Sequence, residues 1–262
     1  MCAVSSAPCA GDTPSGALRT AYGARIFLPM RLILFDIDGT LLWTDGAGRR
    51  AIHRALLDEA GTAGPIEGFR FDGKTDPQIV SELLGLAGHP DAQSDGRITA
   101  VCRRYVELLA AELAKPTQAT TLYPGVAQLL AALEEHERAG RALVGLLTGN
   151  VESGAALKLR SAGLDPARFA VGAFGSDSHR RADLPAVAAK RAERLTGRPF
   201  TGADLVIVGD TPDDVACGRP MGARAVAVAT GFYDVAALRA AGASHVFEHL
   251  RDTRAVLDAL LA

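Results

Sequence analysis

The chain of 262 residues contains no apolar run approaching the ~18 residues that a membrane-spanning helix requires. An excess of charge of one sign is also missing, because 28 Lys and Arg stand against 30 Asp and Glu with no basic block. Neither nucleic acid nor a membrane surface is therefore an expected partner. The first 29 residues lack the continuous apolar core of a signal peptide, and we expect residues 1–29 to form a flexible tail.

Cysteine is scarce and scattered. The four thiols form neither a C-x-x-C pair nor a zinc-like cluster; they are Cys2, Cys9, Cys102 and Cys217. This spacing argues against a disulfide scaffold or a structural zinc site. Reduced thiols in a cytoplasmic protein are the simplest interpretation.

What the chain does contain, from Arg31 onward, is a regular alternation of short apolar runs with segments of helical periodicity. Strands are predicted over residues 31–35, 142–147, 169–174, 204–209, 224–229 and 245–247. Helices are predicted over residues 126–138, 152–162, 184–195, 213–221, 235–241 and 253–261. Continuous apolar runs are typical of parallel strands covered on both faces. The pattern predicts an α/β fold with a doubly wound, mostly parallel, Rossmann-like sheet.

One region breaks this alternation. Between Thr44 and about Thr121 the sequence has helical periodicity and no convincing strand, with Ile79, Val80 and Leu83 on one apolar face. We expect residues 44–121 to form an inserted helical domain. Residues 30–43 and 122–262 would then form the α/β core, which resumes at the helix start marked by Pro124 and Gly125.

Three polar clusters follow predicted strands. Asp36 and Asp38 end the first strand in "LFDIDGTLL", residues 148–150 ("TGN") follow the second, and Asp210 and Asp214 lie in "GDTPDD" after a later strand. Ligands in open α/β sheets bind beyond the carboxyl ends of the strands, so these clusters should meet. A calcium hand is excluded for Asp36 because the required glycine is misplaced. An oxygen-only set suits Mg²⁺, although turn aspartates that merely cap helices are an alternative.

At these residues the chain resembles the haloacid dehalogenase superfamily, and within it the hydrolases with a helical cap that are phosphoglycolate phosphatase-like. "DIDGT" matches the first motif, D-x-D-G-T. Thr148 in "LLTGN" matches the second motif, and Asp210 and Asp214 in "VGDTPDD" match the acidic fourth motif. The helical insert lies where the family has its cap. The resemblance extends from about Arg31 to the C-terminus.

The resemblance implies a Mg²⁺-dependent phosphatase that acts on a small phosphorylated metabolite through an aspartyl-phosphate. Asp36 would be the nucleophile, and Asp38 would protonate the leaving oxygen and then deprotonate the attacking water. The chain must turn after Asp38 to aim both carboxyl groups at one phosphate, and Gly39 is a suitable place for that turn. Asp36, the backbone carbonyl of Asp38 and Asp210 would ligate the metal. Asp214 would support the metal or orient a basic residue.

The remaining family roles fall on other loops. The Thr148 hydroxyl and the Gly149 amide would hold phosphoryl oxygens, whereas Asn150 is a candidate N-cap of the next helix. The lysine of the third motif has no match here, since residues 175–193, the region directly before the acidic strand, contain no K-P pair. We assign its role to Arg181 at the expected helix start, and the alternatives are Arg180 and Lys190.

The insert contributes one further candidate. Lys74 lies in the loop "FDGKTD" and is a candidate for binding a second anionic group of the substrate, with simple surface exposure as the alternative. A phosphomutase that resembles β-phosphoglucomutase would use the same two aspartates and is the second functional hypothesis. A non-phosphate hydrolase of the superfamily or a relative that only binds ligand fits less well, because Asp36 and Asp38 are both present. We expect a monomer or a homodimer.

Overall fold

In the computed structural model, the main sheet has six parallel strands in the order β5-β4-β1-β6-β7-β8. The strands are β1 Arg31–Phe35, β4 Ala142–Leu147, β5 Val171–Ala173, β6 Leu205–Gly209, β7 Arg224–Val228 and β8 His245–Phe247. The structure describes Met1, Ala3 and residues 30–262. The remaining residues of the predicted N-terminal tail, Cys2 and Cys9 among them, lie outside this description.

Strand β1 is the centre of the sheet. It pairs with β4 on one side and β6 on the other, and Phe35 is in register with Leu146 and Val208. The three strands therefore end at the same edge. This register brings the residues after β1, β4 and β6 together, although they are far apart in the sequence.

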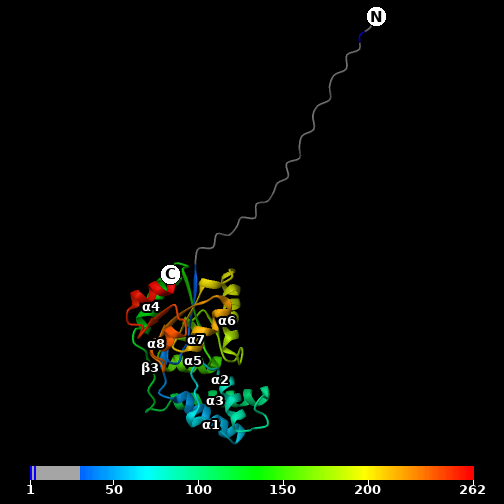
Figure 1. Cartoon of the computed structure of the whole chain (residues 1–262), viewed down its shortest axis with the longest axis vertical. Helices are drawn as coiled ribbons and strands as arrows, with labels where there is room; N and C mark the ends of the chain where they lie inside the picture. Colours follow the sequence, from blue (N-terminus) through cyan, green and yellow to red (C-terminus); the bar gives the residue numbers. More distant parts are fainter. Residues whose placement is uncertain (2, 4–29) are drawn as a thin grey trace.

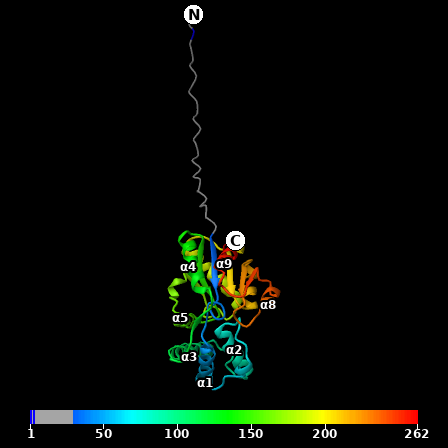
Figure 2. The ribbon, with the colours of Figure 1, turned by 90° about the vertical axis from the view of Figure 1, so that its left-hand side faces the viewer.

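Helices cover both faces of the sheet (Figures 1 and 2). One face packs against α4 Val126–Arg138, α5 Glu152–Ser161 and α9 Thr253–Leu261. The other packs against α6 Leu184–Thr196, α7 Pro212–Cys217 and α8 Val235–Ala240. Within β1, Ile33 and Phe35 belong to the first face and Leu32 and Leu34 to the second, and all four are fully buried. Burial on both faces explains the continuous apolar runs, and the predicted doubly wound fold is confirmed.

The predicted helix 213–221 is too long. Helix α7 ends at Cys217, and a separate 3-10 turn, Arg219–Met221, follows it. Pro220 is the physical reason, because it lacks the N–H of a helical hydrogen bond and its ring crowds the carbonyl of residue 216. Cys102 and Cys217, the cysteines among the described residues, are free and buried.

The insert contains three helices, α1 Ala47–Ala60, α2 Asp76–Leu86 and α3 Asp95–Leu113. Thr75 and Ser94 cap α2 and α3 by accepting backbone N–H groups. The three helices share a hydrophobic cluster that includes Ile52, Val80 and Tyr105. Figures 1 and 2 show them beyond one end of the sheet, while the N-terminal end of β1 lies at the opposite end. The boundaries 44–121 of a separate domain stay a prediction.

A two-stranded antiparallel ribbon joins the insert to the core. Strand β2, Leu42–Trp43, pairs with β3, Thr121–Leu122, so that Trp43 lies opposite Thr121. The chain leaves the core and returns to it at neighbouring points.

No helix among the residues that the structure describes is long and apolar enough to cross a membrane.

Candidate active site between the sheet edge and the helical insert

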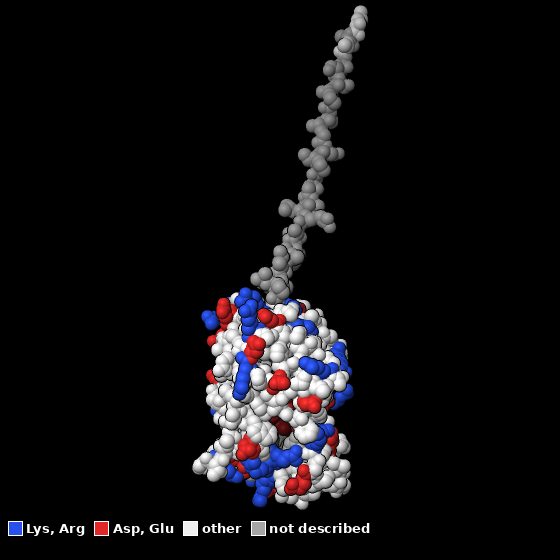
Figure 3. Space-filling view, turned by 60° about the vertical axis from the view of Figure 1, so that its left-hand side comes forward, with Lys and Arg blue, Asp and Glu red and all other residues white. Residues whose placement is uncertain are grey.

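A cavity of about 460 Å³ lies between the carboxyl edge of the sheet and the helical insert. Its lining combines Asp36, Asp38 and Asp210 from the core with side chains of α1 and of the loop before α2. In the space-filling view a hollow opens at the junction of the two parts, with acidic side chains at its floor (Figure 3). The volume falls in the usual range for small-molecule sites, about 300–1,000 Å³.

Three buried carboxylates cluster at this end of the cavity, where Asp36 and Asp210 line it and Asp214 lies behind them. Oxygens of Asp36, Asp210 and Asp214 lie within 4.8 Å of one another. Burial raises the pKa of Asp36 and of Asp210, and the neighbouring carboxylates raise both further. Buried negative charges in such proximity favour a cation among them, and an all-oxygen donor set matches the chemistry of Mg²⁺.

Glycine is required beside Asp210 for two reasons. Gly39 has φ of 84°, so the chain turns directly after Asp38, as the sequence predicts. A Cβ at Gly39 would also lie 2.3 Å from Asp210 Oδ2. Asp210 is fixed on its other side by Thr40, whose hydroxyl donates to Asp210 Oδ1 at 2.9 Å. Gly39 and Thr40 of the first motif therefore also determine where the Asp210 side chain lies.

Asp214 is occupied by hydrogen bonds. Its Oδ2 accepts from the backbone N–H of Thr211 at 3.0 Å, and the Thr211 hydroxyl oxygen accepts from the backbone N–H of Asp214 at 3.1 Å, which together form a capping box at the start of α7. The same Oδ2 also accepts from the Thr211 hydroxyl at 2.7 Å. Its Oδ1 accepts from Arg181. This arrangement favours the orienting role over direct metal ligation, and both assignments stay predictions.

Arg181 lies between two of the carboxylates. Its guanidinium nitrogen Nη2 is 3.3 Å from Asp36 Oδ2 and also contacts Asp214, and the side chain is buried. Burial opposes the charge, but the carboxylates of Asp214 and Asp36 outweigh it and raise the pKa of Arg181. The two alternatives, Arg180 and Lys190, are exposed. The geometry therefore supports Arg181, whose catalytic role stays a prediction.

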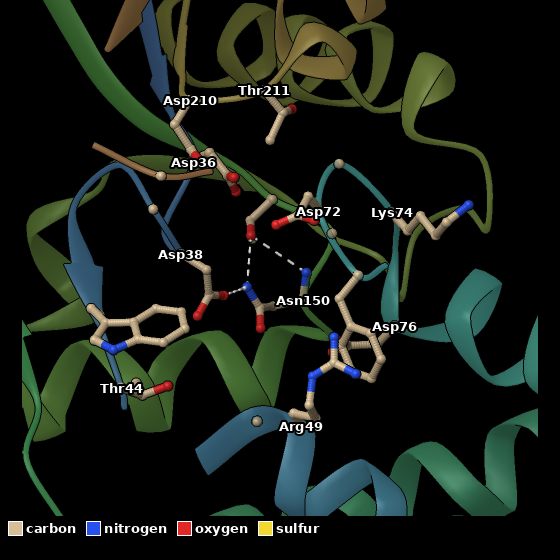
Figure 4. A pocket seen from close by; sticks show the side chains of 18 of the residues that line it. Asp36, Asp38, Thr44, Arg49, Asp72, Lys74, Asp76, Asn150, Asp210 and Thr211 are labelled. Carbon is tan, nitrogen blue, oxygen red and sulfur yellow. Dashed lines mark hydrogen bonds between the residues drawn. The ribbon is translucent and has the colours of Figure 1, made fainter. Parts of the chain in front are cut away.

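Asp38 is not part of the cluster of Asp36, Asp210 and Asp214 that could hold a metal ion. Its Oδ2 accepts hydrogen bonds from Asn150 Nδ2 and from Lys158 Nζ, both at 2.7 Å. Asn150 also donates to the Thr148 hydroxyl oxygen at 2.8 Å (Figure 4). Asn150 is not the N-cap of α5, because that helix begins at Glu152 with Val151 at its N-cap.

The loop after β4 is covered by the insert. A Cβ on Gly149 would lie 2.0 Å from the backbone carbonyl oxygen of Lys74, so only glycine permits this approach. The backbone N–H of Asp76 donates to the carbonyl of Gly149 at 2.7 Å, and Asp76 Oδ2 accepts from the N–H of Val151 at 2.8 Å. The start of α2 is thereby docked on the loop that carries Thr148, which is fully buried.

Lys74 does not face the carboxylates. Its Nζ pairs with Glu82 at 2.9 Å, and Figure 4 shows the side chain directed away from Asp36 and Asp38. Its assignment to substrate binding stays a prediction that this geometry does not favour. Arg49 of α1 also lines the cavity from the insert, and its guanidinium donates to the carbonyls of Ile66 and Phe69 at 2.8 Å each.

Sequence reasoning missed Lys158, Asp76 and Arg49. For Lys158 a signal existed. On α5 it shares a face with Ala155 and Leu159, both buried, and a lysine at such a position requires a partner. Asp76 and Arg49 gave no comparable signal, because charged residues at the surface of amphipathic helices are common.

Asp76→Asn should increase the stability of the folded protein at pH 7–8 and lose this advantage in acid. Burial raises the pKa of Asp76 from 3.8 to about 6. The contribution of this carboxyl to stability is therefore complete below pH ~3.8 and is lost as the pH rises through ~6. The loss amounts to at most about 3 kcal/mol, since one pKa unit corresponds to 1.36 kcal/mol. Asparagine avoids it and can still accept the Val151 N–H.

Urea unfolding of both proteins between pH 4.5 and 8 measures this difference. Asp95→Asn is the matched control, because Asp95 likewise begins a helix of the insert but is exposed. Its substitution removes no buried charge, so it reports the effect of the Asp-to-Asn change alone. A difference between Asp76→Asn and wild type that does not change with pH would contradict the burial of a charged Asp76.

Comparison with known proteins gives three findings. A family model described as haloacid dehalogenase-like hydrolase matches residues 30–222. Phosphoglycolate phosphatases are similar in sequence: that of Nitrosospira multiformis is 27% identical over 209 residues, 78% of this chain and 86% of the relative. That of Rhodospirillum rubrum is 28% identical over 211 residues, 77% and 80% of the two chains. A solved hydrolase from Pseudomonas syringae shares the fold, with TM-score 0.67 and 22% identity over 89% of this chain and 100% of that one.

Proposed function

Because the chain belongs to the haloacid dehalogenase-like hydrolases, we propose that it is a Mg²⁺-dependent phosphatase for a small phosphorylated metabolite. The observation that carries the proposal is the position of Asp36. This carboxylate directly follows the central strand β1, lies in a cluster with Asp210 and contacts buried Arg181 at 3.3 Å. The nucleophilic oxygen of Asp36, the guanidinium of Arg181 and carboxylates suited to binding a metal ion thus lie together at one end of a covered cavity.

The chemistry proceeds in two half-reactions. An Asp36 oxygen attacks phosphorus, the bond from phosphorus to the ester oxygen breaks, and Asp38 gives its proton to that leaving oxygen. Water then attacks the phosphorus of the aspartyl-phosphate and gives a proton to Asp38. The bond between phosphorus and Asp36 breaks, inorganic phosphate leaves, and both side chains return to their starting states.

The other groups of the site compensate the charge of the phosphoryl group and fix its orientation. Arg181 offsets the negative charge of the phosphoryl oxygens as they approach Asp36, and Asp214 keeps the guanidinium in place. The Thr148 hydroxyl and the Gly149 amide bind phosphoryl oxygens. Mg²⁺ would be held by Asp36, Asp210 and the Asp38 carbonyl, and when bound it would neutralise these carboxylates and polarise the phosphoryl group.

The insert suggests a small substrate. Helix α2 is docked on the loop of Gly149, so the cavity lies beneath a cover that excludes phosphoproteins and limits bulk water. The relatives named phosphoglycolate phosphatase support a small metabolite monoester as the substrate. A phosphomutase remains the second candidate, because it would use Asp36 and Asp38 in the same way but keep the phosphoryl group.

The test is phosphate release from a panel of phosphorylated metabolites, including 2-phosphoglycolate and hexose phosphates, with MgCl₂ or with EDTA. We expect stoichiometric free phosphate from at least one monoester in Mg²⁺, its loss in EDTA and its return when Mg²⁺ is restored. Isomerised substrate that requires a trace of bisphosphate, with little free phosphate, would favour the mutase. Release that is indifferent to EDTA would contradict the metal site.

A further inference from the structure

Lys158 is a buried charge that none of the roles above uses. It lies on α5 with its side chain 6% exposed, and its ammonium group is 2.7 Å from Asp38 Oδ2. Within the described part of the chain, Asp38 is its ion-pair partner. Burying an ammonium group costs free energy unless the group is paired. Packing alone therefore does not account for a lysine at this position.

We propose that Lys158 is a positioning residue that holds the Asp38 carboxylate in its working orientation. The inference rests on the proposed function, in which Asp38 transfers protons to and from the reacting oxygens. Lys158 acts through Asp38 and touches no substrate atom.

The geometry of Asp38 supports this role. Lys158 and Asn150 both donate to the same oxygen, Oδ2. The two donors come from different parts of the core, the end of β4 and the second turn of α5. Two anchors on one oxygen fix the torsions of a short side chain. No hydrogen bond among residues 30–262 engages Oδ1, which leaves that oxygen for proton transfer.

The helical insert shares in holding Lys158. A Cβ on Gly48 of α1 would lie 3.3 Å from the Lys158 ammonium and 3.6 Å from the hydroxyl of Tyr105 on α3. The ammonium group therefore lies where α1 and α3 meet α5. The absence of a side chain at Gly48 leaves room for it. With the insert seated in this way, Lys158 has little freedom to leave Asp38.

A merely structural ion pair would behave differently. Its loss would loosen the site and slow all substrates alike. Loss of orientation at Asp38 would instead depend on how much the leaving group needs a proton. An alkyl ester needs it in the first half-reaction, whereas p-nitrophenyl phosphate does not, because p-nitrophenolate leaves readily.

The experiment compares Lys158→Met with wild type on p-nitrophenyl phosphate and on the alkyl ester turned over fastest in the metabolite panel. On the alkyl ester we expect kcat/KM to fall by about 10- to 100-fold, part of the 10²–10⁴ typical of general acid catalysis. On p-nitrophenyl phosphate we expect kcat/KM to change by less than about threefold. With p-nitrophenyl phosphate, kcat and KM of Lys158→Met should both fall, because the second half-reaction, hydrolysis of the aspartyl-phosphate, still needs Asp38 as a base and becomes rate-limiting. A burst of p-nitrophenol should precede the steady state.

Three companions complete the test. Arg160→Met changes an exposed basic residue on the same helix and should leave both substrates unaffected. Asp38→Asn should show the same split between leaving groups as Lys158→Met, that is, a greater loss of kcat/KM on the alkyl ester than on p-nitrophenyl phosphate, and the split should be larger. Lys158→Gln keeps a hydrogen-bond donor and replaces the apolar variant if that protein does not fold, with a weaker split expected.

The outcomes separate the two proposals. If wild type releases phosphate and Asp38→Asn shows the split, but Lys158→Met slows both esters equally or neither, the positioning role of Lys158 is wrong and the phosphatase stands. If folded wild type releases phosphate from no ester in Mg²⁺, the proposed function itself fails, and the role of Lys158 fails with it.

Discussion

Asp36→Asn should reduce turnover of the preferred phosphate ester to below ~1% of wild type, because the amide cannot attack phosphorus. The substitution also removes one negative charge from the proposed metal ligands, so Mg²⁺ binding should weaken in parallel. The fold should survive. Burial raises the pKa of the Asp36 carboxyl, and Arg181 keeps Asp214 as a partner when Asp36 is replaced, so a neutral amide should be accommodated at this position.

Steady-state phosphate release and thermal unfolding measure the two parts of this prediction. Asp45→Asn is the control, since Asp45 is exposed and asparagine tolerates its φ of 47°. That variant should match wild type in activity. Activity of Asp36→Asn above ~1% of wild type, in a preparation free of contaminating phosphatase, would argue against covalent catalysis by this residue.

Arg181→Ala should lower kcat/KM by about 10²–10³, the loss typical when one preorganised electrostatic group is removed from a transition state. The structure adds a second expectation. Arg181 is buried between Asp36 and Asp214, so its removal leaves both carboxylates buried without their cationic partner. The folded state should lose about 3–5 kcal/mol, as when a buried ion pair is broken.

Arg181→Lys separates catalysis from folding. It restores the charge and most of the stability but not the two-pronged grip of the guanidinium, and should recover only part of kcat/KM. Arg180→Ala and Lys190→Ala are the controls, because both side chains are exposed on the same segment. A damaged Lys190→Ala protein beside an active Arg181→Ala protein would overturn the assignment.

The predicted fold succeeds where local chemistry and burial agree. β1 and β4 have the predicted bounds, because each is an apolar run buried on both faces. β5 is shorter than the predicted 169–174. Phe169 closes the 3-10 turn Pro166–Arg168 with its N–H bonded to the carbonyl of Pro166 at 3.2 Å, so it cannot begin the strand.

The site divides in a similar way. The rule for strand ends is enough to bring Asp36 and Asp210 together, because it needs only the order of the elements. The contacts of Lys158 and Asp76 depend on how the helical insert docks against the core. No periodicity or spacing encodes such docking, since the partners come from segments whose relative placement is fixed only by the complete fold.

The ribbon of β2 and β3 has a consequence for how this protein can diversify. Trp43 and Thr121 face each other, so everything between them is, for the main sheet, a single closed loop. Loop closure grows slowly in cost, by about 0.6 kcal/mol for each doubling of length. A longer, shorter or unrelated insert can therefore replace the present one while the sheet keeps its register. Insertions and deletions between Trp43 and Thr121 are thus compatible with the sheet, whereas residues of the insert that contact the core, such as Gly48 and Asp76, are constrained by those contacts.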